Sequence, residues 1–213
     1  MADLIFYTNP QSRGQTVRWM LEEVGQPYET RVLDYASTMK AEPYLSVNPM
    51  GKVPAIVHKG KIVTEVAAIC CYLADAFPDT GLAPPTNDRA DYYRWIFFTS
   101  GPIEAAFSNK AAGWEPTPER QRMFGYGNYD LAIGTLEKAL ADKEYIAADH
   151  FTAADLFVGA NVNFMLTFKL LEPRPVFVDY AKRMTDRPAY HRAKEIDGKL
   201  IAEAQAKQAP QPA

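Results

Sequence analysis

The sequence predicts an α/β domain followed by an all-helical domain. In the first 77 residues short apolar β runs alternate with segments of helical spacing, whereas beyond residue 89 long amphipathic helices replace the strand signals. The segment between them, residues 79–89, is rich in Pro, Gly and Asp, as domain boundaries often are. A chain of 213 residues, 47% of them hydrophobic, can bury two modest cores. We therefore predict one domain over residues 1–78 and a second over residues 88–208.

The first domain follows the predicted order β-α-β-α-β-β-α. Strands are expected at Leu4–Tyr7, Tyr28–Leu33, Ala55–His58 and Ile62–Thr64. Helices are expected at Arg13–Val24, Glu65–Phe77 and, in short irregular form, Ala41–Val47. Strands joined through a helix run parallel and a close pair runs antiparallel, so we expect a mixed sheet with helices packed on it.

The second domain carries helical periodicity almost throughout. Its helices are expected at Asp88–Ala112, Pro118–Ala141, Thr152–Phe168, Val176–Thr185 and Pro188–Ala206.

Charge and hydropathy exclude several classes of partner. The 23 basic and 26 acidic residues are mixed along the chain and give a net charge of -3, so no basic stripe is present for nucleic acid. No stretch approaches the roughly 18 apolar residues of a membrane span, and the first residues lack a signal-peptide pattern. We expect a soluble, cytoplasmic protein with neither a nucleic-acid nor a membrane partner.

Cysteine and histidine give no sign of a metal site. Cys70 and Cys71 are the only cysteines, and they are adjacent in a helical pattern, where a mutual disulfide would be strained. The spacing of His58, His150 and His191 does not fit metal ligation, so we expect them to be structural or exposed. We predict neither a disulfide framework nor a metal.

Residues 48–55 read Asn-Pro-Met-Gly-Lys-Val-Pro-Ala and resemble the N-P-x-G-x-V-P signature of the glutathione S-transferases. In that family the Val-Pro bond is cis. The resemblance implies that Val53 and Pro54 present a short free backbone edge, which can pair with the cysteinyl backbone of glutathione.

A second segment, residues 64–69, resembles the E-S-x-A-I element that opens the third helix of that family. Free N–H groups and the positive dipole end at Val66 would hold the γ-glutamyl carboxylate, while Glu65 would accept the γ-glutamyl ammonium. Val66 stands where the family has Ser or Thr, so the hydroxyl donor is missing.

A third segment, Phe151–Leu156, resembles the capping box and hydrophobic staple of the family's sixth helix, with Thr152 and Asp155 as the reciprocal pair. That motif concerns folding, and its aspartate is not catalytic. The three segments recur in the family's order, so the chain resembles the cytosolic glutathione S-transferases of the bacterial, Ser-type kind. The resemblance implies a thioredoxin-like N-terminal domain and an all-helical C-terminal domain.

Enzymes that use glutathione favour its thiolate, although a free thiol has a pKa of about 8.5. A donor aimed at the sulfur stabilises the charged form, and in this family it lies between the first strand and the first helix. Ser12 aligns with the Ser or Cys of the bacterial and Ser-type classes and is the first candidate, with helix N-cap as its alternative role. Tyr7 and Asn9 are the other candidates, with core aromatic and turn residue as alternatives.

Four charged residues would complete the binding set. A surface role is as open as a binding role for Lys52 and Arg13. Lys40 is a weaker candidate than Lys52, and an exposed helical carboxylate is the commoner interpretation of Glu104. Lys52, or else Lys40, would pair with the glycyl carboxylate, and Arg13 would add positive potential near the sulfur. Glu104 would help to bind the γ-glutamyl ammonium from the second domain. The electrophile would lie against aromatics that are candidates for either pocket or core: Tyr93, Phe97, Phe107 and Trp114.

The function that the resemblance implies is detoxification by a homodimer that conjugates glutathione to a hydrophobic electrophile, with glutathione as co-substrate and no metal. Two alternatives remain. One is a glutathione-dependent peroxidase or thiol reductase, and the other is a non-catalytic protein of the same fold.

Overall fold

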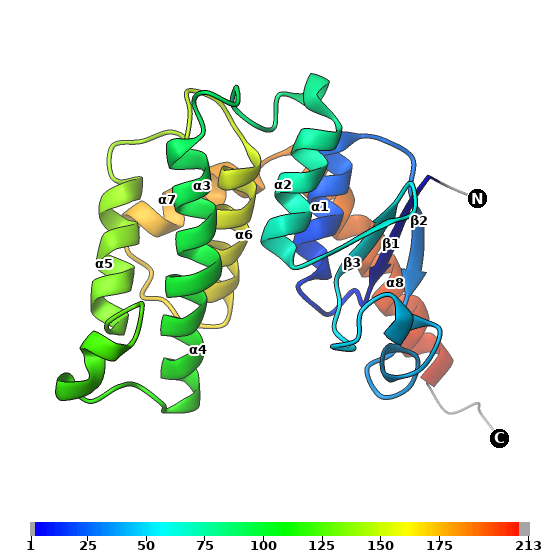
Figure 1. Ribbon diagram of the computed structural model, residues 1–213, viewed down its shortest axis with the longest axis horizontal. Helices are drawn as coiled ribbons and strands as arrows, with labels where there is room; N and C mark the ends of the chain where they lie inside the picture. Colours follow the sequence, from blue (N-terminus) through cyan, green and yellow to red (C-terminus); the bar gives the residue numbers. More distant parts are fainter. Residues whose placement is uncertain (1–2, 209–213) are drawn as a thin grey trace. The chain divides into compact units, whose positions relative to one another are not determined.

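The computed structural model describes residues 3–208, which form two compact units. One unit is the described part of Met1–Thr80 together with Arg187–Ala213, and the other is Gly81–Asp186. The division differs from the predicted one at the end of the chain, because the last helix, α8 (Pro188–Gln208), belongs to the first unit (Figure 1). Helical periodicity shows that a helix forms there but does not show which unit it packs against.

The first unit contains the predicted mixed sheet. Its strands are β1 (Leu4–Thr8), β2 (Glu29–Val32), β3 (Ala55–His58) and β4 (Lys61–Thr64), in the spatial order β2-β1-β3-β4. The β1–β2 pair is parallel, and the β1–β3 and β3–β4 pairs are antiparallel. A helix therefore connects the parallel pair and a tight turn connects the last pair, as expected.

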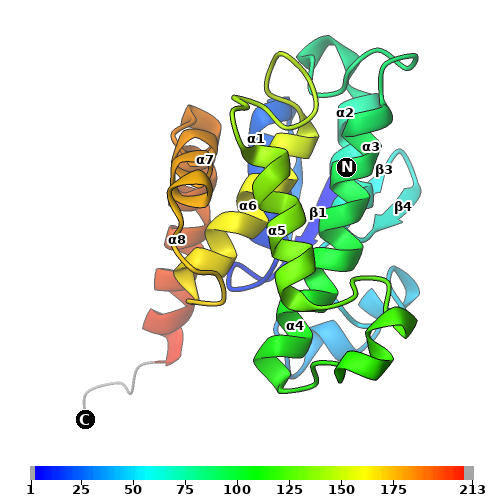
Figure 2. The ribbon, with the colours of Figure 1, turned by 90° about the vertical axis from the view of Figure 1, so that its left-hand side faces the viewer.

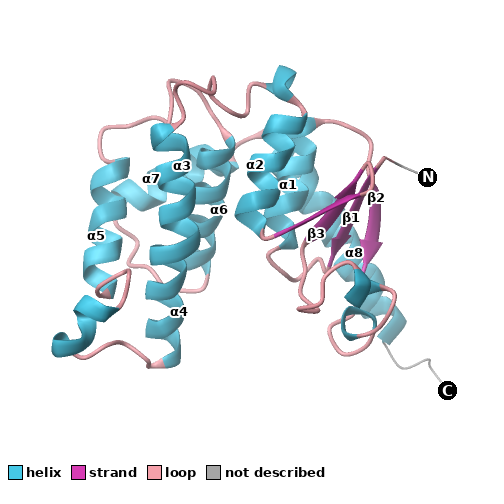
Figure 3. Cartoon of the chain, viewed as in Figure 1, coloured by secondary structure: helices cyan, strands magenta, loops and turns pink. Residues whose placement is uncertain are grey.

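Helices α1 (Gly14–Val24) and α2 (Val66–Ala76) pack on each other, and Figure 3 shows them beside one face of the sheet. The other face is covered by a segment that holds two short 3-10 helices, Thr38–Lys40 and Tyr44–Ser46, in place of the predicted irregular helix over 41–47. The buried cluster under this segment consists of Tyr7, Leu33, Met39, Tyr44 and Ala55.

Helix α8 is attached to α1 by charge as well as by packing. The guanidinium of Arg18, 1% exposed, donates to the Asp197 carboxylate at 2.6 Å. Nearer the start of α8, Arg187 makes two bonds of 2.7 and 2.9 Å to the carboxylate of Glu23. These pairs give α8 a defined position along α1.

The second unit is all-helical, as predicted. Its helices are α3 (Ala90–Phe98), α4 (Glu104–Ala112), α5 (Tyr129–Leu140), α6 (Ala153–Thr167) and α7 (Pro175–Thr185). Figure 2 shows α4 and α5 within this unit. Helix α6 is its centre, since residues 153–159 are all buried and α3 and α7 both pack on it.

One predicted helix of this unit is found with an irregular middle, and another is wrong in extent. The helix expected over 88–112 contains a π-helical segment, Thr99–Ile103, where Pro102 provides no backbone donor. The helix expected over 118–141 is a 3-10 helix at Pro118–Met123 followed by a loop, and α5 begins only after Asn128. The Asn128 side chain caps α5 by accepting the Leu131 N–H at 2.8 Å.

The capping box at α6 is confirmed. Asp155 accepts the backbone N–H of Thr152 at 3.0 Å, and the Thr152 hydroxyl accepts a first-turn N–H. The same carboxylate accepts the Ile146 N–H at 2.7 Å and the Tyr180 hydroxyl at 2.9 Å. Asp155 thus joins α6, the preceding loop and α7. Among residues 3–208, no helix has the length and apolar character needed to cross a membrane.

Candidate functional site

The register of the sheet brings three separate segments to one of its ends. Tyr7, near the end of β1, pairs with Ala55 at the start of β3, and Ala55 in turn pairs with Thr64 at the end of β4. The β1–α1 turn, the residues that precede β3 and the start of α2 therefore share one end of the sheet. These are the segments that contain Ser12, Val53 and Val66.

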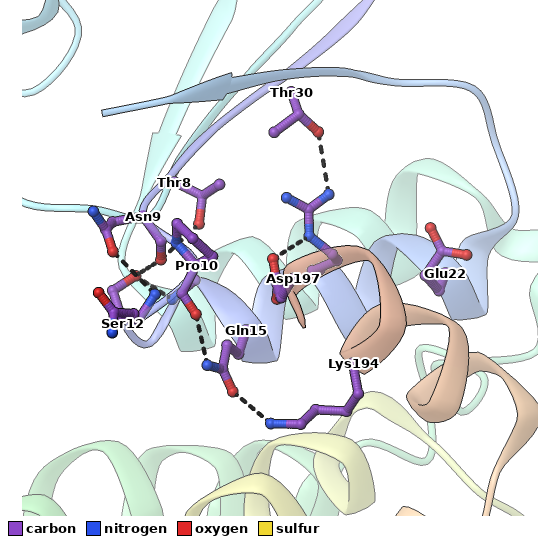
Figure 4. Close-up of polar contacts among 12 residues, drawn as sticks. Thr8, Asn9, Pro10, Ser12, Gln15, Glu22, Thr30, Lys194 and Asp197 are labelled. Carbon is purple, nitrogen blue, oxygen red and sulfur yellow. Dashed lines mark hydrogen bonds and ion pairs between the residues drawn. The ribbon is translucent and has the colours of Figure 1, made fainter. Parts of the chain in front are cut away.

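The β1–α1 turn is held by its own hydrogen bonds (Figure 4). The Ser12 N–H donates to the Asn9 carbonyl at 3.0 Å, and the Ser12 hydroxyl donates to the same oxygen at 2.6 Å. The Ser12 Oγ accepts the N–H of Gly14 at 2.9 Å. Because the Asn9 carbonyl has a second donor, the hydroxyl hydrogen can turn to a ligand without leaving that oxygen unpaired.

Glycine at position 14 permits the close approach of α1 to β1. A Cβ there would lie 2.0 Å from the Oγ1 of Thr8 and 3.0 Å from the Oγ of Ser12. Only a residue without a side chain allows α1 to begin so near the strand. This approach places the Ser12 hydroxyl directly beyond the end of β1.

The other two thiol-donor candidates have structural partners. The Asn9 amide nitrogen donates to the Leu33 carbonyl at 2.8 Å, which ties the turn to the end of β2. The Tyr7 hydroxyl accepts from Arg31 at 2.9 Å, and the Tyr7 ring lies in the buried cluster, 5.3 Å from the ring of Tyr44. This arrangement favours Ser12 over Tyr7 and Asn9 as the group that meets a ligand.

The peptide bond between Lys52 and Val53 is oriented by two side chains that sequence reasoning missed. Asn48 donates its amide to the Lys52 carbonyl at 2.9 Å, and the Tyr44 hydroxyl donates to the same oxygen. Burial raises the pKa of Tyr44 to about 12, so this hydroxyl keeps its proton at ordinary pH. The N–H of a trans peptide points opposite to its C=O, so the Val53 N–H faces away from these two donors.

Two further features of this loop agree with the resemblance. The Val53-Pro54 bond is cis, as it is in the family, and the Glu42-Pro43 bond, for which nothing was expected, is cis as well. Val53 precedes the first paired residue of β3, Ala55, so its backbone lies outside the ladder. Asn48 is the first residue of the signature, and its side-chain amide indicated in the sequence that a hydrogen bond within the loop could orient the backbone.

The start of α2 presents backbone donors. Glu65 has a φ of 66° and an exposed side chain that makes no capping hydrogen bond to the helix. Val66 and Ala67 are the first residues of α2, where N–H groups have no partner within the helix and the dipole is positive. This end of the helix suits a carboxylate, and Val66 adds no hydroxyl to it.

The basic candidates differ in their surroundings. Lys40 donates its ammonium to the Gly51 carbonyl and so supports the loop before Val53. The Lys52 side chain is exposed beside that loop, and Arg13 is half-buried at the N-cap position of α1. Lys40 is thus engaged with the loop backbone, whereas the Lys52 side chain points to solvent.

The remaining candidates lie in the second unit. Glu104 is half-buried in the first turn of α4. Tyr93 and Phe97 are exposed neighbours on α3 with ring centroids 6.5 Å apart, and Trp114 is 74% exposed beyond α4. Phe107 is buried and contacts a pair that sequence reasoning missed: its ring lies 6.1 Å from Phe164, which lies 4.6 Å from the exposed Phe168.

The histidines are placed as structural or surface groups. His58 is buried on β3, where its ring nitrogen lies 3.0 Å from the Tyr72 hydroxyl, and burial lowers its pKa. His150 is exposed and pairs with Asp149 at 2.7 Å, and His191 is exposed on α8. Within residues 3–208, no three His, Cys, Asp or Glu side chains lie together in a way that could hold a metal.

Comparison with known proteins gives the same family from sequence and from structure. The sequence model described as "Glutathione S-transferase, N-terminal domain" matches residues 12–76. Glutathione S-transferase GstA of Escherichia coli O157:H7 is 29% identical over 160 residues, 73% of this chain and 78% of that protein. Glutathione S-transferase 2 of Schizosaccharomyces pombe is 31% identical over 156 residues, 67% of each chain.

Solved structures extend the likeness to nearly the whole chain. A glutathione transferase from Methylococcus capsulatus superposes with a TM-score of 0.75 at 27% identity, covering 92% of this chain and 98% of that one. A glutathione transferase from Phanerochaete chrysosporium, solved with oxidized glutathione, gives a TM-score of 0.74 at 27% identity, covering 93% and 97%.

The fold and the comparisons define a protein with a thioredoxin-like domain and an all-helical region of the glutathione transferase architecture. This chain belongs to the glutathione S-transferase family.

Proposed function

We propose that this protein binds glutathione at the sheet end formed by the β1–α1 turn, the Lys52–Val53 peptide and the start of α2, and conjugates it to a hydrophobic electrophile. The observation that supports the proposal most is the convergence of these three segments, each with polar groups suited to a different part of the tripeptide. Family membership makes glutathione the ligand to test first.

Each part of glutathione has a matching group in the proposed mode of binding. The γ-glutamyl carboxylate accepts from the first N–H groups of α2, and its ammonium donates to Glu65. The cysteinyl backbone pairs with the backbone of Val53, whose N–H is turned outward by Tyr44 and Asn48. The glycyl carboxylate pairs with the exposed ammonium of Lys52.

The thiol then lies at the β1–α1 turn. Its proton leaves to water, and the Ser12 hydroxyl turns from the Asn9 carbonyl to donate to the thiolate. The Gly14 N–H that donates to Ser12 Oγ at 2.9 Å polarises the O–H and makes it a stronger donor. The thiolate forms a C–S bond at the electrophilic carbon. The electrons of the bond that breaks leave on the departing group or, in an addition, move to the neighbouring atom, which takes a proton from water. The enzyme contributes thiolate formation and proximity.

The electrophile binds against aromatics of the second unit, and we include Phe164 and Phe168 beside Tyr93, Phe97, Phe107 and Trp114. The protein works in the cytoplasm in detoxification, as a two-fold homodimer. Light scattering checks the assembly: we expect twice the chain mass of 23.8 kDa, and the monomer mass at micromolar concentration would contradict the dimer.

The decisive experiment is calorimetric titration with glutathione, followed by ultraviolet titration of the bound thiolate and a screen of electrophiles. Binding with a thiol pKa below the free value of about 8.5, and turnover of at least one electrophile, is the expected result. Turnover only of peroxides or mixed disulfides would indicate a peroxidase or reductase. Binding with no turnover would indicate a non-catalytic member, and no binding would contradict the proposal.

A further inference from the structure

We propose that Gln15, held by Lys194 of α8, is a positioning residue for the Ser12 hydroxyl; this inference rests on the proposed function. The Gln15 amide nitrogen donates to the Pro10 carbonyl at 2.6 Å. The Lys194 ammonium donates to the Gln15 amide oxygen at 2.9 Å. Figure 4 shows the Gln15 side chain between the turn and the lysine of α8.

The chemistry of the three groups defines how the amide is oriented. An ammonium can only donate, so the Gln15 atom that faces Lys194 is the oxygen, and a carbonyl can only accept, so the atom that faces Pro10 is the nitrogen. The positive charge on Lys194 polarises the amide and strengthens its N–H as a donor to Pro10. The three groups therefore form one directed chain from α8 to the turn.

The Pro10 carbonyl belongs to the central peptide of the turn that carries Ser12. The N–H on the other edge of that peptide, from Gln11, donates to the Asn9 side-chain oxygen at 2.9 Å. The Pro10–Gln11 peptide plane is thus held at both edges, by Gln15 on the carbonyl side and by Asn9 on the N–H side. Rotation of this plane would open the turn closed by the bond from the Ser12 N–H to the Asn9 carbonyl. Gln15 therefore restricts the motion that would misdirect the Ser12 hydroxyl.

Helix α8 supplies a fixed point for this chain. Lys194 lies between two contacts of α8 with α1: the Arg192 guanidinium donates to the Glu22 carboxylate at 3.2 Å, and the Asp197 carboxylate accepts from buried Arg18 at 2.6 Å. These two contacts fix the backbone of Lys194 relative to α1, although the lysine side chain itself is flexible. A C-terminal helix 179 residues away in sequence reaches the turn in this way.

The test is a double-mutant cycle with Gln15→Met and Lys194→Met, read by the pKa of bound glutathione and by kcat and KM. We expect Gln15→Met to raise the pKa and to reduce kcat near pH 7 by about fivefold, the size of one neutral hydrogen bond. The Kd measured at a pH where bound glutathione keeps its thiol proton should stay unchanged, and the defect in kcat should disappear above about pH 8.5, where the thiol ionises without help. Lys194→Met should act in the same direction by about twofold, and the double variant should match Gln15→Met alone.

Three further variants separate positioning from charge and from general effects on α8. Lys199→Met removes another lysine of α8, one that pairs with Glu195 at 2.7 Å, and should leave the pKa of bound glutathione unchanged. Gln15→Glu keeps the acceptor for Lys194 but replaces the donor to Pro10 by an oxygen, so it should reproduce the defect. Gln11→Glu adds the same charge to an exposed position of the turn, and its shift is subtracted as the effect of charge alone.

Amide hydrogen exchange at Ser12 and Gly14 gives a readout that needs no ligand, and Gln15→Met should accelerate it. A folded Gln15→Met protein with wild-type pKa and kcat would overturn the inference. So would a Lys194→Met shift that persists in the Gln15→Met background, since the lysine would then act through its charge. A defect in Ser12→Ala without one in Gln15→Met contradicts only the role of Gln15, whereas a wild-type protein that does not bind glutathione contradicts the proposed function as well.

Discussion

Helices α1 and α6 each begin beside a hydroxyl side chain, and the two hydroxyls have very different surroundings. Thr152 at the start of α6 is completely buried, and its hydroxyl donates to the carboxylate of Asp155 at 2.9 Å. Ser12 before α1 is half-buried, and its hydroxyl donates to the neutral carbonyl of Asn9 at 2.6 Å. A bond to a carboxylate is roughly twice as strong as one to a neutral acceptor, so the two protons differ in how easily they turn away.

The difference shows what separates a hydroxyl that stabilises a fold from one that is available for chemistry. Both protein acceptors keep a second donor, because the N–H of Thr152 also bonds to Asp155 and the N–H of Ser12 also bonds to Asn9. Thr152, however, has no exposed surface through which a ligand could approach. The charge of the acceptor and the access to solvent therefore distinguish the two helix starts, although both hydroxyls cap a first turn.

The start of α2 is a third case, in which the N-cap residue makes no side-chain hydrogen bond to the helix. Val66 is its first residue, and Glu65 makes no capping bond. The donors of α2 are thus left for an external acceptor, whereas those of α6 are occupied by its own capping box. At the start of α6 the hydrogen-bonding groups are occupied by the capping box. At the start of α1 the Ser12 hydroxyl can turn to another acceptor, and at the start of α2 the backbone N–H groups can bind an external acceptor.

The largest effect, on the free energy of unfolding, should come from removing the Asp155 carboxylate at the start of α6. Asp155→Ala removes the acceptor of the Ile146 N–H, the Thr152 N–H and hydroxyl and the Tyr180 hydroxyl. A buried donor without a partner costs about 1–3 kcal/mol, so we expect a loss of about 3–5 kcal/mol in the free energy of unfolding. Urea denaturation measures it, with Asp155→Asn, which keeps one acceptor, as the milder control. A loss below about 1 kcal/mol would show that this network does not hold the second unit.

The next largest effect should come from removing the Ser12 hydroxyl before α1. If Ser12 donates to the bound thiolate, Ser12→Ala should move the pKa of bound glutathione toward about 8.5 and reduce turnover near pH 7 by about tenfold or more. Affinity for the thiol form of glutathione should change little, because the tripeptide is held by Val53, Glu65 and Val66, whereas the apparent Kd near pH 7 should rise together with the pKa. The pH–rate profile is the measurement, and the defect should shrink as the pH rises above about 8.5. An unchanged pKa with unchanged turnover would transfer the role to Tyr7 or Asn9.

Removing the corresponding hydroxyl at the start of α6 should affect stability alone. Thr152→Ala removes one cap and one bond to Asp155, which should lower the free energy of unfolding by about 1–2 kcal/mol. Turnover per folded molecule and the pKa of bound glutathione should match the wild type. If Thr152→Ala shifted that pKa as Ser12→Ala does, the contrast between the two helix starts would fail.

The sequence predicted structural features that depend on residues a few positions apart, and it missed those that depend on contacts between residues distant in sequence. The capping box at α6 is a local pattern, because Thr152 and Asp155 lie three residues apart, and it is found as expected. The choice among Ser12, Tyr7 and Asn9 depends on partners at positions 31 and 33, in β2 and just after it, which no local spacing reveals. The same reason explains why α8 was assigned to the second domain.

One error had a local signal that periodicity outweighed. The helix expected over 118–141 contains Gly125, Gly127 and Asn128, and glycine followed by asparagine is a strong sign of a loop and a new helix cap. Gly127 has a φ of 68°, a conformation that ends any continuous helix, and Asn128 caps α5. The apolar spacing on both sides was real, but it belonged to two separate elements.

The smallest effect, on glutathione affinity, should come from adding a hydroxyl to the first residue of α2. Val66 is the first residue of α2, so a serine there would add a donor beside the free N–H groups without capping the helix itself. A hydrogen bond to a carboxylate contributes about 1.5–3 kcal/mol, and less where water competes, so Val66→Ser should tighten glutathione binding by about threefold. Val66→Ala is the matched control, since it removes the same methyl groups and adds no donor. Calorimetry on both variants isolates the hydroxyl, because any loss of packing is common to the two. Equal affinities would mean that the γ-glutamyl carboxylate does not lie at the start of α2, and the assignment of Glu65 to its ammonium would then fail as well.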